Sequence, residues 1–157
     1  MDPPIRRILT ASDFSDHSER ATAYAAALAR QLRVDLLLLH VVEPTLYGSP
    51  FMTAPVADMA VEFQKIARST LETAANLIRQ AGTNVEVLVE TGAPWHEIIE
   101  VAKRHQANLI VIGTHGRHGL SRALIGSIAE KIVRWSPIPV LAVPITEAAL
   151  GKNPSST

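Results

Sequence analysis

The sequence predicts an α/β fold, an open parallel five-stranded sheet with helices on both faces. Five short apolar segments alternate with four stretches in which apolar residues recur at helical spacing. Apolar residues make up 47% of the 157 residues and aromatic residues only 4%, which is typical of a Leu, Ile, Val and Ala core between a sheet and helices. The order β-α-β-α-β-α-β-α-β requires crossovers and therefore a mostly parallel sheet.

The first half of the chain predicts two buried strands and two helices. Residues 5–10 and 36–42 are apolar runs without alternation, which indicates strands buried on both faces. A helix is expected over 16–32. After a connection with three prolines (43–55), a second helix is expected over 56–81, followed by a glycine that ends it. Its apolar face is expected to hold Met59, Phe63, Ile66, Thr70, Ala74, Leu77 and Ile78.

The second half repeats this pattern. Residues 85–90 alternate valine with glutamate or leucine, so this strand is expected near a sheet edge. A helix with proline at its first position is expected over 94–105, and 109–112 is another apolar run. The sequence S-x-x-E from Ser127 is a capping box that begins a helix ending before a proline, and a last strand is expected over 138–143. The last helix is expected to bury Ile128, Ile132 and Val133.

These strands predict a spatial order. Because alternation places the third strand at an edge and right-handed crossovers leave few topologies, we expect the order 3-2-1-4-5. Winding then reverses between strands 1 and 4, and ligands in such sheets bind at the carboxyl ends of the strands beside the reversal. Those ends are residues 11–13 and 112–116.

Composition excludes several functions. Lys plus Arg and Asp plus Glu each number 15, so no general attraction to nucleic acid or anionic membranes is expected. There is no cysteine, which excludes disulfides and thiolate zinc sites. No apolar run reaches the roughly 18 residues that span a bilayer. We expect a cytoplasmic protein with one domain over 1–146 and a disordered tail over 147–157.

Four of the eight glycines lie in the segment 110–127, between a strand and a helix. Their spacing includes Gly113-x2-Gly116-x9-Gly126-Ser127. Glycine lets backbone N–H groups approach a ligand, and a helix N-terminus offers unpaired N–H donors and a positive dipole end. The pattern predicts a phosphate-binding loop, although a tight connection would also use glycines. Neither GxxxxGK[ST] nor an initial GxGxxG is present.

This signature and the chain from residue 5 to 143 resemble the universal stress protein family. Further landmarks are Asp13, the HVV at 40–42, the segment 108–132 and the Pro-x-Pro-Val ending at 137–140. The resemblance implies a Rossmann-like domain that binds ATP or a related adenine nucleotide, usually as a homodimer, and acts in stress responses. The family often has Asp at position 108 and Pro at position 11, where this chain has Asn and Ala.

The resemblance also implies the phosphate contacts. Gly113, Gly116, Gly126 and Ser127 match the family's phosphate and ribose contacts. The Ser127 hydroxyl can bind phosphate and also cap the helix, because it both donates and accepts. At the same end, the Ile128 backbone N–H is a further donor. Arg117 is either a cation for the terminal phosphate or a solvated surface residue.

At the adenosine end, Asp13 resembles a family site residue. A carboxylate beside phosphates would repel them, so Asp13 is expected near ribose hydroxyls or at a Mg²⁺ ion, with a turn or cap role as the alternative. Val41 is expected to hold the adenine edge through its backbone, and Ala11 and Ile112 to form apolar walls. His115 belongs to the predicted site, but with His118 it lacks a third ligand, so no protein-bound metal is expected.

The predicted function is that of a nucleotide-binding regulator. ATP binding would alter the dimer, or its surface for an unidentified protein partner. No nucleophile with a base and an orienting group is evident, so turnover is not predicted. The alternatives are a slow ATPase or nucleotidyl-transfer enzyme, and an interaction module that binds no nucleotide. Residues 138–143 would leave an apolar sheet edge exposed, which predicts a homodimer through this strand.

Overall fold

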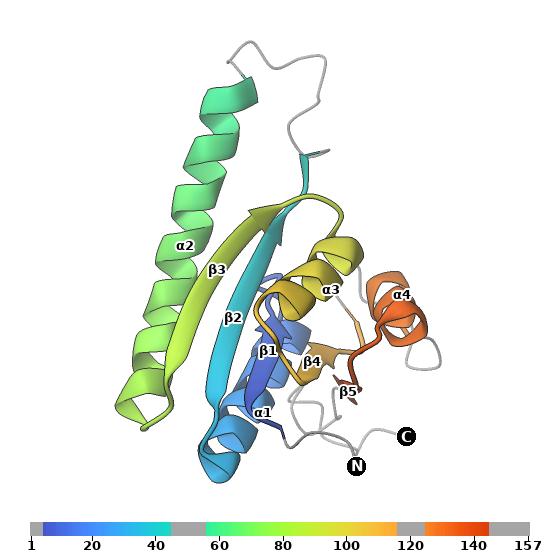
Figure 1. The fold of residues 1–157 in the computed structure, drawn as a ribbon. Coiled ribbons are helices and arrows are strands. Elements are labelled where there is room, and N and C mark those ends of the chain that lie inside the picture. The colour runs from blue at the N-terminus through green and yellow to red at the C-terminus, as the bar shows by residue number, and fades with distance from the viewer. Residues whose placement is uncertain (1–4, 45–55, 116–124, 145–157) are drawn as a thin grey trace, which may run out of the picture.

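The computed structural model describes residues 5–44, 56–115 and 125–144, and side chains in α2 from residue 58 onward. All strand pairs are parallel, in the order β3-β2-β1-β4-β5 (Figure 1). This confirms the α/β, Rossmann-like fold and its strand order. The elements are β1 (Arg7–Ala11), α1 (Asp16–Leu32), β2 (Asp35–Val42), α2 (Val56–Gln80), β3 (Val85–Thr91), α3 (Pro94–Arg104), β4 (Leu109–Gly113), α4 (Ser127–Trp135) and β5 (Val140–Val143).

The sheet is buried on both faces. Successive residues of its central strands point to opposite sides, and helices cover each side. Ile8 and Leu36 belong to a core that includes buried residues of α1 and α2. Their neighbours Leu9 and Leu37 belong to a second core, with buried residues of α3 and α4. The unbroken apolar runs seen in the sequence are therefore two alternating faces, each covered by a pair of helices.

Strand register aligns the ends that matter for a ligand. Thr10 of β1 pairs with Leu38 of β2 and with Val111 of β4, so the carboxyl ends of the three strands lie at one edge of the sheet, where β2 continues to Val42, beyond the end of β1. From β1 the chain winds to β2 and β3 on one side, and β4 and β5 lie on the other. The expected reversal of winding between β1 and β4 is therefore present, and β3 is the edge strand that its alternation predicted.

The buried face of α2 agrees only in part with the predicted one, since Met59, Ala74 and Ile78 are partly buried and pack against the core. Phe63, Ile66 and Leu77 are exposed, whereas the buried positions are Ala67, Leu71 and Ala75. These three recur at intervals of four, and the two alanines are small enough for the helix to lie close to β2 and β3. Helical spacing predicted a face that includes the large apolar residues, but the fully buried positions lie one step further around the helix.

The start of α4 also differs from the prediction. Its N-cap is Gly126, and Ser127 is the first helical residue, so Ser127 does not cap the helix as the S-x-x-E pattern suggested. Two of the three predicted core residues also face outward: Ile128 is 39% exposed and Val133 is 52% exposed. Ala129 and Ile132 are the buried residues of this helix.

No helix in the described ranges has both the length and the apolar character needed to cross a membrane. The proposed tail over 147–157 lies outside the described residues.

Two leucines of α2 test which face of this helix carries stability. Leu71 is 1% exposed and Leu77 is 66% exposed. We expect Leu71→Ala to lower the free energy of unfolding by about 2–5 kcal/mol, because it leaves a cavity in the core. The same substitution at Leu77 should change it by only about 0.5 kcal/mol. Urea denaturation followed by circular dichroism measures both, and equal losses would show that α2 is packed differently.

Candidate functional site

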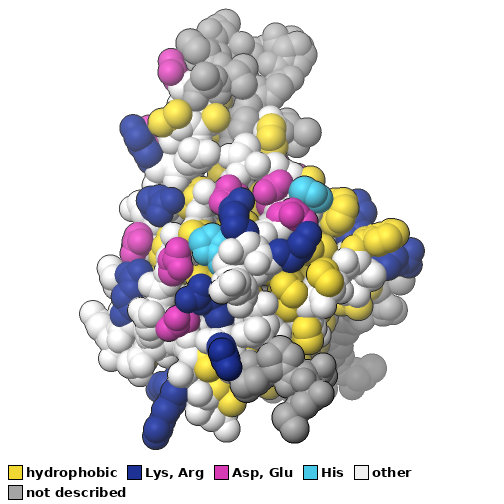
Figure 2. All heavy atoms as spheres, in the orientation of Figure 1, with side chains coloured by type: hydrophobic (Ala, Val, Ile, Leu, Met, Phe, Trp, Pro, Cys, Tyr) yellow, Lys and Arg dark blue, Asp and Glu magenta, His cyan; other side chains and the backbone are white. Residues whose placement is uncertain are grey.

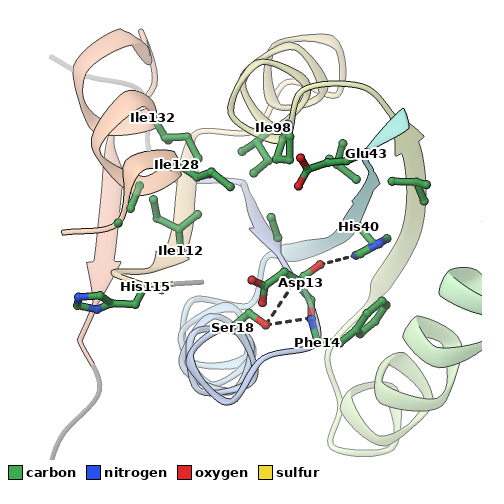
Figure 3. A pocket seen from close by; sticks show the side chains of 18 of the residues that line it. Asp13, Phe14, Ser18, His40, Glu43, Ile98, Ile112, His115, Ile128 and Ile132 are labelled. Atoms are coloured by element: carbon green, nitrogen blue, oxygen red, sulfur yellow. Dashed lines mark hydrogen bonds between the residues drawn. The ribbon is translucent and has the colours of Figure 1, made fainter. Parts of the chain in front are cut away.

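A cavity of about 380 Å³ lies at the carboxyl ends of β1, β2 and β4. Figure 3 looks into it and shows Ile112 and Ile128 on one side, Ile98 and Glu43 on another, and Asp13 below them. It occupies the place beside the reversal of winding where ligands bind in sheets of this kind. The described residues that line it are Ala11, Ser12, Asp13, Phe14, Ser18, His40, Val41, Val42, Glu43, Phe63, Ile66, Ala67, Pro94, Ile98, Ile112, Gly113, Thr114, His115, Gly126, Ser127, Ile128, Ala129 and Ile132.

The fold brings most of the predicted site residues to this one cavity. Gly116 and Arg117 lie outside the described residues. Their roles toward a ligand remain predictions. The predicted site residues that line the cavity are Ala11, Asp13, Val41, Ile112, Gly113, His115, Gly126, Ser127 and Ile128.

Residues from the other helices were missed by the sequence reasoning. Phe63 and Ile66 of α2 and Ile98 of α3 also line the cavity. Each sits in a helical pattern that indicates packing, and no local motif marks any of them as part of a site. Only the crossover connections that carry α2 and α3 over the sheet bring them to the strand ends.

The N-terminus of α4 opens into the cavity without a side-chain cap. The backbone N–H of its N-cap, Gly126, donates to the carbonyl of Thr114 at 2.7 Å, and no side chain among the described residues caps the helix. The N–H of Glu130 is already used, because it donates to the Gly126 carbonyl at 2.8 Å. The N–H groups of the residues before it are the ones a helix leaves unpaired, at the positive end of its dipole. This end of α4 is therefore suited to an anion.

The N-terminus of α1, by contrast, is filled by its own side chains. The Ser15 hydroxyl caps the helix by accepting from the N–H of Ser18 at 3.3 Å. Ahead of it, the N–H and the hydroxyl of Ser15 both donate to Asp13 Oδ1, and the N–H of Asp13 donates to Ser18 Oγ at 3.2 Å. Asp13 thus has the turn role that was left open as an alternative. Its carboxylate also lines the cavity, so a ligand role is compatible with this turn.

Phe14 and His40 form a stacked pair at the α2 end of the cavity. Their ring centroids are 4.4 Å apart, and their planes are inclined by 26°. His40 Nδ1 lies 2.7 Å from the carbonyl oxygen of Ser12, which accepts only, so Nδ1 carries the proton. Phe14 has φ of 64°, a left-handed conformation that is unfavourable for a bulky residue. The stack and the serine bonds around it hold this strained turn at the edge of the cavity.

Gly113 is required by packing. A Cβ at this position would lie 2.9 Å from the backbone oxygen of His17 in the first turn of α1. This glycine therefore permits the close approach of α1 to the end of β4. The role that the sequence suggested for Gly113, close approach of a ligand to the backbone, remains a prediction beside this observed one.

Charge in the cavity is unevenly placed. Among the described residues that line it, the carboxylates are Asp13 and Glu43, and there is no Lys or Arg. A phosphate bound here would therefore depend on backbone N–H groups and the dipole of α4 for its stabilisation by these residues.

Fold and cavity together define a class of protein: doubly wound α/β domains that hold a small ligand where the winding of the sheet reverses. Within that class, the chain belongs to the universal stress protein family, which it matches over residues 4–144. The resemblance seen in the glycine spacing is thus confirmed.

Known relatives extend along nearly the whole chain. Universal stress protein YxiE of Bacillus subtilis is 31% identical over 144 residues, which are 87% of this chain and 97% of that protein. The structure of MJ0577 from Methanocaldococcus jannaschii is similar with a TM-score of 0.80 at 25% identity, covering 90% of this chain and 97% of that one. A universal stress protein from Archaeoglobus fulgidus in complex with dAMP has a TM-score of 0.60 at 26% identity, covering 87% and 96%.

Substitution of Gly113 tests the packing role of this residue. We expect Gly113→Ala to lower the free energy of unfolding by about 1–3 kcal/mol, because its Cβ meets a backbone oxygen that moves only with the helix. Thermal or urea unfolding measures this effect without any ligand. Wild-type stability in the variant would show that the first turn of α1 shifts freely. A destabilised variant would also show that bulky residues at Gly113 are unsuitable for isolating ligand contacts.

Proposed function

We propose that this protein binds an adenine nucleotide in the cavity at the reversal of winding and acts as a dimeric regulator in a stress response. The observation that carries the proposal is the uncapped N-terminus of α4 at one end of a largely apolar cavity. A nucleotide combines the two chemistries, since its phosphates need N–H donors and its base needs apolar walls. The relative in complex with dAMP supports the adenine class.

The phosphates would lie at the start of α4. Ser127 and Ile128 provide N–H groups there, and the exposed Ser127 hydroxyl takes no part in capping. Gly126 presents no side chain toward a bound anion. Arg117 would add a cation to the terminal phosphate, and a Mg²⁺ ion would offset further charge.

The adenosine would extend from there across the ends of β1 and β2. Ala11 and Ile112 would face the base, and the backbone of Val41 would bind its edge. The Asp13 carboxylate would accept from the ribose hydroxyls, at a distance from the phosphates that limits charge repulsion. Its bonds from Ser15 hold the carboxylate in place before the ligand arrives.

Ser127→Asp is the variant that tests the phosphate end. A carboxylate at the first position of a helix favours helix stability, so the variant should remain folded. It would place negative charge where the phosphates are proposed to bind. We expect magnesium ATP to bind the wild-type protein near the micromolar range, about 8 kcal/mol, and to bind the variant at least about tenfold more weakly, in titration calorimetry of nucleotide-stripped protein.

Two controls make this measurement specific. Ser69→Asp makes the same change at an exposed position of α2 outside the cavity and should leave ATP affinity unchanged. Titration with GTP and AMP tests the adenine preference and the contribution of the terminal phosphates. Absence of binding in the wild-type protein, or equal affinity in Ser127→Asp, would contradict a phosphate site at α4.

We further propose that the dimer forms through β5. Within the described chain, β5 pairs with β4 on one side only. The adjacent helix α4 exposes Val133 and Trp135, and Figure 2 shows hydrophobic side chains gathered at this side of the molecule. A second copy pairing along β5 would satisfy the open backbone edge and shield apolar surface.

The hydrogen bonds of β5 indicate a variant that acts on the open edge alone. The carbonyl of Pro139 accepts from the N–H of Ile110 in β4 at 2.9 Å, and that of Val143 accepts from the N–H of Thr114, just after β4, at 3.2 Å. Since backbone groups alternate sides along a strand, those of Ala142 point away from β4. Ala142→Pro should remove an outward donor and convert the dimer to a monomer in multi-angle light scattering, and a single cooperative unfolding transition should show that the subunit is still folded. The control is Ala142→Ser, which keeps the backbone N–H and should remain a dimer. A monomeric wild-type protein at micromolar concentration, or a dimeric Ala142→Pro variant, would contradict this interface.

A further inference from the structure

Two histidines from distant parts of the chain face each other beside the end of β4. His17 lies in the first turn of α1, and His115 follows β4 after one intervening residue. Their ring centroids are 5.4 Å apart, and their planes are inclined by 47°. In Figure 3 the ring of His115 is turned away from Ile112 and Asp13, so it is not directed at the centre of the cavity. The close approach at Gly113 is what brings the two rings together.

Within the described part of the chain, each of these rings has a buried nitrogen that finds no hydrogen-bond partner. The atoms are Nδ1 of His17 and Nε2 of His115. Buried polar atoms in folded proteins are nearly always paired, because leaving one without a partner destabilises the fold. Two such nitrogens on adjacent imidazoles point to a shared partner.

The surroundings of His115 favour a partner that accepts a lone pair. Its Nδ1 lies 2.9 Å from the hydroxyl oxygen of Thr114. When Nδ1 donates to that oxygen, Nε2 is unprotonated and presents its lone pair. Metal-binding histidines are held in this manner, with the second nitrogen donating to a fixed acceptor that sets the tautomer and the ring orientation.

The separation of the two rings also suits a metal ion. Zinc binds imidazole nitrogen at about 2.0–2.1 Å, so two imidazoles on one tetrahedral ion have ring centroids about 5 Å apart. We propose that His17 and His115 bind a divalent transition-metal ion of the zinc, nickel or copper type, which imidazole ligands favour. Within residues 5–44, 56–115 and 125–144, no group of three His, Asp or Glu residues could hold a metal, which leaves the remaining coordination positions to water or a ligand from solution.

This site differs in chemistry from any magnesium ion that accompanies phosphates. Mg²⁺ takes oxygen ligands and keeps much of its water, so it is not expected to bind a pair of imidazoles. The two proposals are therefore separable, because the metal site is tested without nucleotide. Failure of either one leaves the other standing.

The experiment measures thermal unfolding of the full chain, without a polyhistidine tag, in EDTA and then in excess Zn²⁺, Ni²⁺ or Mg²⁺. We expect Zn²⁺ and Ni²⁺ to raise the Tm of the wild-type protein and Mg²⁺ to leave it unchanged. In a domain of this size, each five- to tenfold increase in the folding equilibrium constant through metal binding should raise the Tm by about 2–4 °C. His17→Gln and His115→Gln should lose the shift. His96→Gln should retain it, because His96 is an exposed histidine elsewhere, on α3.

Calorimetric titration with Ni²⁺ adds a second readout, with one ion expected per chain. Thr114→Val keeps both histidines but removes the hydroxyl partner of His115, and we expect about tenfold weaker binding. Thermal unfolding in EDTA shows whether each variant is folded. If a histidine variant does not fold, Thr114→Val still tests the site, because it keeps both histidines. No shift in the wild-type protein, a full shift in both histidine variants, or wild-type affinity in Thr114→Val would overturn the proposal.

Discussion

The pairing of β1 with β4 is the contact on which the rest of the structure depends. Ile8 and Leu9 of β1 are fully buried, one on each face of the sheet, so this strand lies at the centre of both cores. Winding reverses at the same place, which sends α1 to one face and α4 to the other. Because the two helices diverge, neither covers the ends of the strands between them, and the cavity lies there.

The N-termini of the two helices at this cavity, α1 and α4, have the same backbone geometry but differ in how they are capped. Both begin with N–H groups that the helix itself leaves unpaired. In α1, Ser15 and Asp13 fill those positions and make a rigid turn. In α4, the N-cap is a glycine, and no side chain in the described part of the chain caps the helix. The chemical difference between the two ends is therefore set by a few cap residues and not by the fold.

Gly113 connects the packing of the domain to the chemistry around the cavity. Its lack of a side chain admits the backbone of α1, and that approach places His17 against His115. A glycine in a phosphate-loop pattern can thus be required for packing within the protein. The spacing of glycines in the sequence does not distinguish this packing role from contact with a ligand.

The sequence by itself determined the fold class, the strand order and the place on the sheet where the cavity lies. Apolar periodicity and connection length are local properties, and the handedness of crossovers converts them into a topology. Nine of the proposed site residues were found on the cavity for the same reason, since they lie at strand ends or at a helix start. Only the tertiary structure decided which face of α2 is buried, that Gly126 and not Ser127 caps α4, and that His17 meets His115. These features depend on packing distances between segments that are remote in the chain, and such distances leave no trace in local sequence.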